Sequence, residues 1–319
     1  MSRQIQETFI VPDHLALQRI DIVAVELLPD YSRSRLQSWI KSGDLKVNGL
    51  AVKPKDKVMA RDEITLDVEL EPEGDWVAED IALDIVYEDK HLLVINKPAD
   101  LVVHPAPGHR GGTVVNAVLH HCPELESIPR AGVVHRLDKD TSGLMVIAKS
   151  LLAHQSLVDQ LQTRSMGREY EAVVKGELTG GGMVNEPIAR NPQNRQKMAV
   201  VSNGKKAITH YRVLHRFIGF THLRLKLETG RTHQIRVHLA HINHGIVGDP
   251  SYGGRPRLPK GMSEEAIHKV QSFPRQALHA KALALMHPET GEKMSWEVPL
   301  PEDMLELVEC LKAAQQEGL

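Results

Sequence analysis

Apolar residues recur at helical spacing in two consecutive segments near the start of the chain. In ALQRIDIVAVELL (residues 16–28) they repeat every three or four positions, and Pro29–Asp30 then predicts the end of a helix. YSRSRLQSWIKSG (residues 31–43) predicts a second helix, with Ser32 as its N-cap and Gly43 as its C-terminal stop. We therefore expect a compact module that begins with two short helices.

The second predicted helix has an apolar side and a polar side. The side chains expected to face a core are Leu36, Trp39 and Ile40. The side chains expected to face solvent are Arg33, Arg35, Gln37 and Lys41. The next segment, LKVNGLAVK, predicts a β-hairpin, because Asn48–Gly49 lies between alternating apolar arms. Two helices and a hairpin predict an α/β module, which a linker around residues 72–80 would follow.

From about Ile81 the apolar pattern becomes that of many strands. ALDIVYEDKHLLVINKP predicts a hairpin that turns at Asp89–Lys90, and AGVVHR and GLMVIAKS predict two further strands. The remaining predicted strands are REYEAVVKGEL, AITHYRVLHRF and THLRLKLETG. Helical spacing occurs over about residues 152–161 and in RTHQIRVHLAHI. Because strict strand–helix alternation is missing, we expect an α+β domain with a mixed, largely antiparallel sheet. The expected domains are residues 1–75 and 76–319.

Composition is that of an ordinary soluble globular protein. Hydrophobic residues make up 41% and charged residues 25% of the 319 positions. The first residues lack the apolar core of a signal peptide, and no segment reaches the length of a membrane span. Two cysteines without metal-type spacing, Cys122 and Cys310, favour a reducing cytoplasm over a disulfide framework.

The net charge of −2 conceals an uneven distribution of charge along the chain. Residues 62–89 contain twelve Asp or Glu and no Lys or Arg, which leaves 39 basic against 29 acidic residues elsewhere, a balance of +10. Across residues 33–61 there are eight basic residues and two aspartates. A surface with this bias favours phosphates, so the near-neutral total is compatible with a polyanionic partner.

A polar loop, RLDKDTS, separates two apolar segments between Val133 and Val146. Asp138 and the residues after it match four early positions of a calcium-binding loop, but Lys149 stands where such a loop needs a glutamate. Aspartate and Ser-Gly also stabilise turns through local hydrogen bonds. A third interpretation is a catalytic carboxylate that arginines keep ionised. The residues alone leave the choice between a turn and a catalytic group open.

Three histidines, His238, His241 and His244, are spaced so that a helix would bring two of them to one face. No carboxylate or cysteine group accompanies them, which disfavours a zinc site. The sequence also lacks a phosphate-binding glycine loop, a dinucleotide motif, a cysteine cluster and an HExxH motif. We therefore expect neither a metal nor an organic cofactor.

Five segments of the larger domain resemble, in order, the motifs of the RluA/RluD family of RNA pseudouridine synthases. They are INKPADLVVHP, GVVHRLDKDTSGLMVIAKS, REYEAVV, LETGRTHQIRVHLAHINHGIVGDPSYG and RQALHAKALALMHPETG. Upstream, YSRSRLQSWIKSGDLKVNG resembles the S-four RNA-binding domain, in which a basic helix and a hairpin grip folded RNA. The resemblance implies an enzyme that isomerises uridine to pseudouridine within RNA, with an S-four module before an α+β catalytic domain.

The resemblance implies three catalytic residues. Asp138 matches the family's essential aspartate, whose carboxylate either traps the sugar carbon or removes a proton from the ring. Arg236 matches its cationic partner. Tyr170 matches the tyrosine that stacks on the target base, although a tyrosine within a strand is by itself more typical of a core. Asp140 resembles a loop-building position.

Other residues are implied to contact RNA. Ile235 matches an aliphatic wall beside the base, and Arg136 matches the residue that takes the space of a flipped base. For Arg136 the alternative is a second ion pair with Asp138. Lys97 is expected to contact a phosphate or to form a structural ion pair, and the sequence does not separate the two. The remaining basic residues expected to contact RNA are Arg231, Arg33, Arg35 and Lys41, with His233 beside Arg231.

The resemblance implies ribosomal RNA, or a precursor of the large ribosomal subunit, as the partner. We expect a monomer in the cytoplasm that does not bind a membrane. A non-catalytic RNA-binding or ribosome-assembly factor is one rival, but it predicts loss of Asp138, Tyr170 or Arg236, and all three are present. A glycosidase-like hydrolase is another, and it needs two facing carboxylates about 5–10 Å apart. Asp138 and Asp140, two residues apart on one loop, are poorly placed for that reaction.

Overall fold

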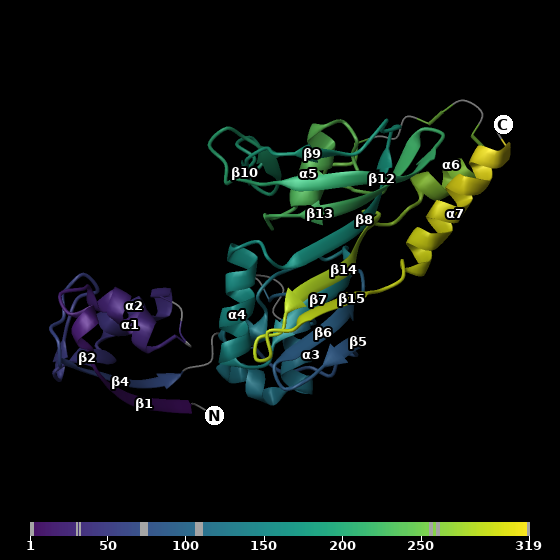
Figure 1. Cartoon of the computed structure of the whole chain (residues 1–319). Coiled ribbons are helices and arrows are strands. Elements are labelled where there is room, and N and C mark those ends of the chain that lie inside the picture. Colours follow the sequence, from purple (N-terminus) through teal and green to yellow (C-terminus); the bar gives the residue numbers. More distant parts are fainter. Residues whose placement is uncertain are drawn as a thin grey trace.

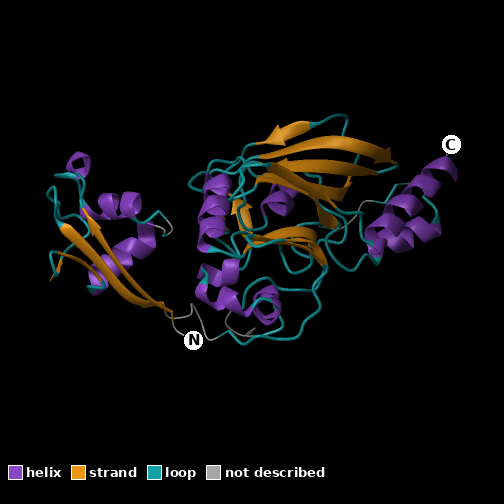
Figure 2. Ribbon diagram, turned by 60° about the horizontal axis from the view of Figure 1, so that its bottom comes forward, coloured by secondary structure: helices purple, strands orange, loops and turns teal. Residues whose placement is uncertain are grey.

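The structure, a computed structural model, describes residues 3–29, 31, 33–70, 76–105, 111–254, 258–259 and 262–317. Figures 1 and 2 show a small N-terminal unit beside a larger body. The two parts have separate hydrophobic cores, whose buried residues lie within Ile5–Val68 and Leu92–Ala314. The expected domain boundary between residues 75 and 76 adjoins segment 71–75, which lies outside the described residues. The division into residues 1–75 and 76–319 therefore stays a prediction.

The N-terminal unit is a four-stranded antiparallel sheet with two helices. The strand order is β1–β4–β2–β3. The strands are β1 (Arg3–Ile10), β2 (Leu45–Val47), β3 (Leu50–Ala51) and β4 (Glu63–Leu70). The helices are α1 (Ile20–Leu27) and α2 (Arg33–Ser42), preceded by a 3-10 turn over Asp13–Leu15. These elements confirm the predicted α/β module.

The first helix begins four residues later than its apolar spacing predicts. Leu17 has a left-handed backbone, with φ of 65°, which interrupts the helical path before Ile20. From there the apolar side is buried, and Ile20 and Val23 have no exposed area. The helix ends at Leu27, before Pro29. Two other expected helix-end residues lie outside the described residues. They are Asp30, at the end of the first helix, and Ser32, the expected N-cap of the second.

The second helix and the hairpin after it have the predicted structure. The three apolar side chains of α2 are buried, and Gly43 follows the helix with φ of 86°. The Gly43 N–H donates to the Trp39 carbonyl over 3.1 Å, which closes the last turn. Asn48 and Gly49, with φ of 52° and 74°, form the two-residue turn that favours hairpins. This packing leaves Arg33 and Lys41 exposed on the surface of the unit.

The larger body is built on a nine-stranded sheet. Its order is β5–β6–β7–β14–β8–β13–β12–β9, and β15 also pairs with β14. Among the described strands every pair is antiparallel except β7 with β14, which confirms the predicted sheet. The strands are β5 (Ile85–Glu88), β6 (Leu92–Lys97), β7 (Ser142–Ala148), β8 (Gly167–Lys175), β9 (Gly182–Val184), β12 (Thr209–Phe217), β13 (Phe220–Leu227), β14 (Leu278–Met286) and β15 (Lys293–Glu297). Strands β10 (Ile188–Arg190) and β11 (Met198–Val200) form a separate ribbon.

Helices cover both faces of the sheet centre, which explains the continuous apolar runs of β6 and β7. On β6, Leu93 and Ile95 pack in the core that includes α3, whereas Leu92 and Val94 pack with Leu157 of α4. The helices of the body are α3 (Val114–His121), α4 (Leu151–Gln162), α5 (Gln234–His241), α6 (Glu264–Gln271) and α7 (Glu302–Glu317), with 3-10 turns over Pro123–Ser127 and Pro129–Gly132. Helices α4 and α5 confirm the two predicted for this region. None of the described helices is both long and apolar enough to cross a bilayer.

The prediction of a strand for AGVVHR, residues 131–136, is wrong. Three consecutive residues of the turn Pro129–Gly132 have positive φ, 54°, 49° and 77°, and a strand does not continue through such a backbone. Val133 then makes a single bridge to β7. Farther along, the Val146 N–H donates to His135 Nε2 over 3.2 Å, so a side chain takes the place of a backbone partner. The path into the polar loop is therefore irregular and depends on side-chain contacts.

Gly143 lies where the polar loop enters β7, and its φ is 112°. A Cβ there would lie 2.3 Å from the carbonyl oxygen and 2.6 Å from the nitrogen of Ala280 on β14. We expect Gly143→Ala to lower the free energy of unfolding by about 3 kcal/mol, because strain and a backbone clash act together. Gly291 also has a positive φ, 70°, but open space around it, so Gly291→Ala is expected to cost about 1 kcal/mol. Urea unfolding compares the two variants, and equal losses would contradict the role given to crowding.

Candidate active site

A cavity of about 630 Å³ brings together seven residues that the sequence singles out. They come from the loop before β7, from β8, and from the start of α5 with the segment before it: Arg136, Asp138, Tyr170, Arg231, His233, Ile235 and Arg236. The lining contains six arginines and two carboxylates, Asp138 and Glu228. A concave site with this excess of cations suits an anionic ligand.

Asp138 sits at the start of a turn, in which its carbonyl accepts a hydrogen bond from the Thr141 N–H over 3.0 Å. Its carboxylate faces the start of α5. Arg236 Nη1 donates to Oδ2 over 3.0 Å, and His233 Nε2 lies 3.8 Å from Oδ1. The side chain is 18% exposed, so it remains open to a ligand in the cavity. Asp138 therefore begins a turn through its backbone carbonyl and also carries a charged group in the cavity through its side chain.

Arg236 is buried and held by two carboxylates. Its Nε and Nη2 donate to the two oxygens of Asp249 over 2.7 and 2.9 Å, which leaves Nη1 for Asp138. Burial alone would lower the pKa of Arg236, but its bonds to Asp249 and the charges of both aspartates raise it overall. Burial would raise the pKa of Asp249, and Arg236 lowers it. The guanidinium is thus a fixed positive charge that points one donor at Asp138.

Sequence reasoning missed Asp249 and Tyr252, which complete this arrangement. Asp249 Oδ1 accepts the backbone N–H groups of Ser251 and Tyr252 over 2.8 and 3.0 Å. The Tyr252 ring lies 5.0 Å from the Arg236 guanidinium, and its hydroxyl lies 2.7 Å from His233 Nδ1. The signal was present in GDPSYG, because Asp followed by Pro and Ser is typical of a turn capped by the aspartate side chain.

Tyr170 and Ile235 belong to the apolar part of the cavity lining. Tyr170 lies on β8 between β13 and β14, opposite Leu225 and Ala280. The two side chains are only 6% and 4% exposed, and both belong to the main core cluster. Burial raises the pKa of Tyr170, so its phenol is neutral near pH 7. Tyr170 is therefore a core residue that also presents a surface to the cavity.

Lys97 does not line the cavity and is 1% exposed. Its Nζ donates to the carbonyls of Pro98, Leu101 and Lys139 over 2.7, 2.9 and 3.0 Å. Burial lowers the pKa of Lys97 to about 7. Neither expected role fits, because the ammonium is enclosed and its partners are carbonyls rather than phosphate or a carboxylate. Lys139 follows Asp138, so we assign Lys97 to the support of the polar loop.

Arg275 anchors the other side of the polar loop. Its Nη1 donates to the carbonyl of Asp140 over 3.1 Å, and its Nε and Nη2 donate to Asp303 of α7. Next to it, Gln276 Nε2 donates to Thr141 Oγ1 over 3.1 Å. The loop that carries Asp138 is thus fixed by groups from several elements, as a precise reaction site requires.

The three basic residues expected to contact RNA from the N-terminal unit lie on α2, and none of them lines the cavity. Arg33 Nη2 donates over 2.8 Å to Asp21, whose side chain has no exposed area. The Arg35 guanidinium lies 5.4 Å from the ring centre of Trp39. Lys41 is exposed near the end of the helix. These residues form a basic face separate from the cavity.

Two of the three histidines, His238 and His244, are engaged in hydrogen bonds, and His241 is exposed at the end of α5. His238 is buried, with its two ring nitrogens 2.9 Å from Thr209 Oγ1 and from the Glu186 carbonyl. His244 Nδ1 lies 2.8 Å from the Lys175 carbonyl. These contacts fit structural histidines rather than metal ligands. A calcium loop does not fit either, because Lys149 pairs with Glu88 instead of facing Asp138.

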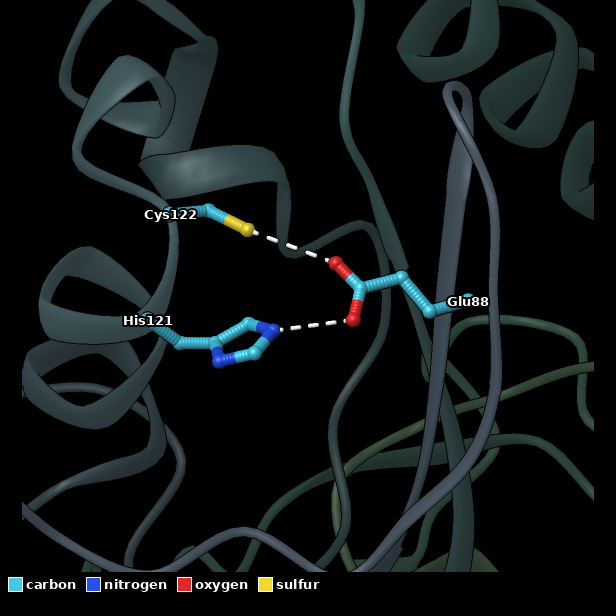
Figure 3. A group of neighbouring side chains, drawn as sticks. All are labelled: Glu88, His121 and Cys122. Carbon is cyan, nitrogen blue, oxygen red and sulfur yellow. Dashed lines mark hydrogen bonds and ion pairs between the residues drawn. The ribbon is translucent and has the colours of Figure 1, made fainter.

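Glu88, His121 and Cys122 form a cluster of possible metal ligands outside the cavity lining (Figure 3). Glu88 Oε2 lies 2.9 Å from His121 Nε2, and Cys122 Sγ lies 3.6 Å from Oε1. The Lys149 ammonium, 2.6 Å from the same Oε1, already balances the carboxylate. Burial raises the pKa of the Cys122 thiol to about 11, which disfavours the thiolate that a metal needs. We interpret the cluster as a link between β5, α3 and the end of β7.

Two regions of the chain match known protein families. Residues 91–241 match the RNA pseudouridylate synthase family, and residues 18–64 match the S4 domain. The chain is 56% identical over 312 residues to Ribosomal large subunit pseudouridine synthase D of Pseudomonas aeruginosa, covering 98% of each protein. It is 52% identical over 318 residues to the protein of that name from Escherichia coli (strain K12), covering 99% of this chain and 98% of that one.

A solved structure agrees with these matches. The fold is similar to that of Human RNA Pseudouridylate Synthase Domain Containing 4, with a TM-score of 0.55 and 29% sequence identity. The likeness covers 72% of this chain and 92% of that one. The family match therefore extends over the cavity-bearing body, and the S4 match over the basic N-terminal unit. The chain belongs to the RluA/RluD family of RNA pseudouridine synthases, with an S4 domain before the catalytic domain.

Proposed function

We propose that this enzyme isomerises specific uridines to pseudouridine in the RNA of the large ribosomal subunit. Relatives that share more than half of its residues over nearly the whole chain carry the name of that activity. The observation that carries the mechanism is the Asp138–Arg236 ion pair inside a cationic cavity. The S4 match on the basic N-terminal unit supports a folded RNA as the substrate.

In this proposal Asp138 is the catalytic group. Isomerisation breaks the bond between the ribose and a ring nitrogen, rotates the base, and forms a bond from the same sugar carbon to a ring carbon. A carboxylate can trap the electron-poor sugar carbon or take the proton from the ring carbon, and both steps use its ionised form. Arg236 donates a hydrogen bond to this carboxylate, and Asp249 keeps Arg236 in place. The bonds made and broken balance within the substrate, so the reaction needs no cofactor.

Tyr170 and Ile235 would hold the base while it turns. A flat aromatic face and an aliphatic side chain make contact with uracil in any rotational orientation, whereas directed hydrogen bonds would resist rotation. Both side chains line the cavity that contains Asp138. Their burial in the sheet core makes this surface rigid, which keeps the base close to the carboxylate.

A uridine within folded RNA must leave its stack to reach Asp138, at a cost of a few kcal/mol. Arg136 is exposed at the cavity, two residues before Asp138. Among the described residues, Arg136 and Asp138 form no hydrogen bond or ion pair with each other. Its position favours the space-filling role over a second ion pair. Arg231 is also exposed at the cavity, and its Nε donates to the Lys206 carbonyl over 3.2 Å. We assign both arginines to contacts with RNA outside the reacting base.

The basic face of the N-terminal unit would supply the first, sequence-independent attraction to RNA. Lys41, Arg35 and Arg33 present positive charge along α2, and Asp21 orients Arg33. Contacts of this kind release counterions from phosphates, so affinity falls steeply with salt. We propose that the enzyme acts as a monomer in the cytoplasm, on ribosomal RNA or on a precursor of the large subunit.

Pseudouridine mapping tests the proposed substrate. Unmodified large-subunit ribosomal RNA transcript, and large subunits from cells that lack the enzyme, are incubated with the protein and no cofactor. We expect new carbodiimide-dependent reverse-transcription stops at a small set of uridines in at least one of the two. The positions of the stops also separate an RluD-like target from the alternative, an RluC-like target, which lies elsewhere in the same RNA. No new stop in either RNA, with new stops in other cellular RNA, would overturn the proposed target but not the activity.

A further inference from the structure

Arg168 lines the cavity but lies outside the proposed catalytic set. It lies on β8 two positions before Tyr170, so both side chains project from the same face of the strand. It is 7% exposed. Its guanidinium lies against Gly230, where a Cβ would come within 2.7 Å of Nη1. Arg168 therefore places a buried positive charge on one side of the cavity, next to the loop before α5.

The charge of Arg168 has no partner within the part of the chain that the structure describes. Among the residues that the structure describes, its guanidinium makes no hydrogen bond and no ion pair, and Nε is buried without an acceptor. The two cavity carboxylates are already engaged, Asp138 by Arg236 and Glu228 by Arg164 and His210. An unpaired buried cation costs stability, so its retention at this place indicates a ligand that supplies the missing charge.

The surroundings of Arg168 favour an anion that comes with the substrate. His135 lies near enough that burial and the charge of Arg168 lower its pKa to about 3, so this histidine is neutral. A guanidinium presents a planar fork that matches two oxygens of a phosphate. A bond to a uracil carbonyl would break each time the base turns, whereas the phosphate keeps its place throughout the reaction. The chemistry therefore favours the backbone of the substrate over its base.

We propose that Arg168 binds a phosphodiester group next to the extruded uridine and holds the backbone of that nucleotide while the base turns beside Tyr170. The inference rests on the proposed extrusion of the base into this cavity, and it does not depend on which RNA is the target. Arg168 is thus a substrate-binding residue whose charge is satisfied only in the complex.

The test replaces single phosphates by neutral methylphosphonates. A synthetic RNA stem-loop is chosen around a uridine that the wild-type enzyme converts, found by mapping total RNA from cells lacking the enzyme. Failure of the ribosomal target therefore does not stop the experiment. Methylphosphonate is placed at the phosphate on either side of that uridine, and kcat/KM is measured for the wild type and for Arg168→Met.

We expect one of the two substitutions to lower kcat/KM of the wild type by about 10- to 100-fold, the range of a hydrogen bond to a charged group. Arg168→Met should lose a similar factor on unmodified RNA and lose nothing more when that phosphate is neutralised. Equal additional losses in both proteins at both positions, or no loss in the wild type at either position, would overturn the proposal.

Stability separates this role from a structural one. Because the charge of Arg168 is unpaired in the free protein, Arg168→Met should keep or raise the Tm. Arg216 serves as the matched control, since it donates to the carbonyls of Leu178 and Thr179 and does not line the cavity. Arg216→Met should lower the Tm and keep the wild-type response to methylphosphonate. A lower Tm for Arg168→Met, with a methylphosphonate response like the wild type, would make Arg168 a structural residue.

Discussion

Asp138→Asn is expected to lower the rate of uridine isomerisation by at least about 10⁴-fold, the scale on which enzymes lose activity when the central reacting group is removed. The amide has nearly the volume of the carboxylate, but it can neither trap an electron-poor carbon nor accept a proton from the ring. Arg236 would stay in place, because two of its three guanidinium nitrogens donate to Asp249. Single-turnover assays on a mapped stem-loop measure the rate, and thermal unfolding checks the fold.

Asp140→Asn is the matched control for that variant. It makes the same chemical change two residues away, on the same loop. The contact that Asp140 makes with Arg275 uses its backbone carbonyl, which the substitution leaves intact. We expect activity within about tenfold of the wild type, since the side chain does not line the cavity. A large loss in Asp140→Asn together with an active Asp138→Asn would mean that the wrong aspartate was assigned.

Local chemistry made part of this fold predictable from sequence. The hairpin of β2 and β3 follows from Asn48–Gly49, which supply the positive φ values that a two-residue turn needs. The end of α2 follows from Gly43 in the same way. In both cases the residues that determine the local structure lie within a few positions of it. The strand wrongly expected for AGVVHR shows the limit of this reasoning, because its place is decided by a side chain, His135, that binds β7.

The candidate site was predictable only as far as motif resemblance extended. Asp138, Tyr170 and Arg236 carry recognisable motifs, and the fold brings them to one cavity from distant parts of the chain. Charge balance could not be read from the motifs. The sequence does not show that two aspartates share Arg236, or that no carboxylate of the described residues pairs with Arg168. Such facts depend on contacts between elements far apart in sequence.

Arg236→Met is expected to affect stability and activity together. Asp249, whose side chain has no exposed area, would lose its cationic partner. A buried charge left unpaired costs about 3–5 kcal/mol, so we expect a loss of that size in the free energy of unfolding at pH 7. Activity should also fall, by about 10²-fold or more, because the Asp138 carboxylate loses its charged hydrogen-bond donor in the cavity. Urea unfolding and single-turnover assays measure the two effects.

The pH dependence identifies Asp249 as the cause of the instability. In the wild type the pKa of Asp249 lies below its ordinary value of 3.8, so the pair stabilises the protein fully above that pH and is lost as pH falls through the lowered pKa. In Arg236→Met the buried carboxyl should protonate at a higher pH than in the wild type, since burial raises its pKa and only the backbone N–H groups of Ser251 and Tyr252 remain to lower it. The gap in unfolding free energy between the two proteins should therefore narrow as pH falls from 7 towards 4.

The double variant Arg236→Met/Asp249→Asn should regain stability at pH 7 and stay inactive, because it removes the buried charge without restoring the donor to Asp138. A gap that stays constant with pH, or a double variant no more stable than Arg236→Met, would show that lost packing rather than unpaired charge governs this site.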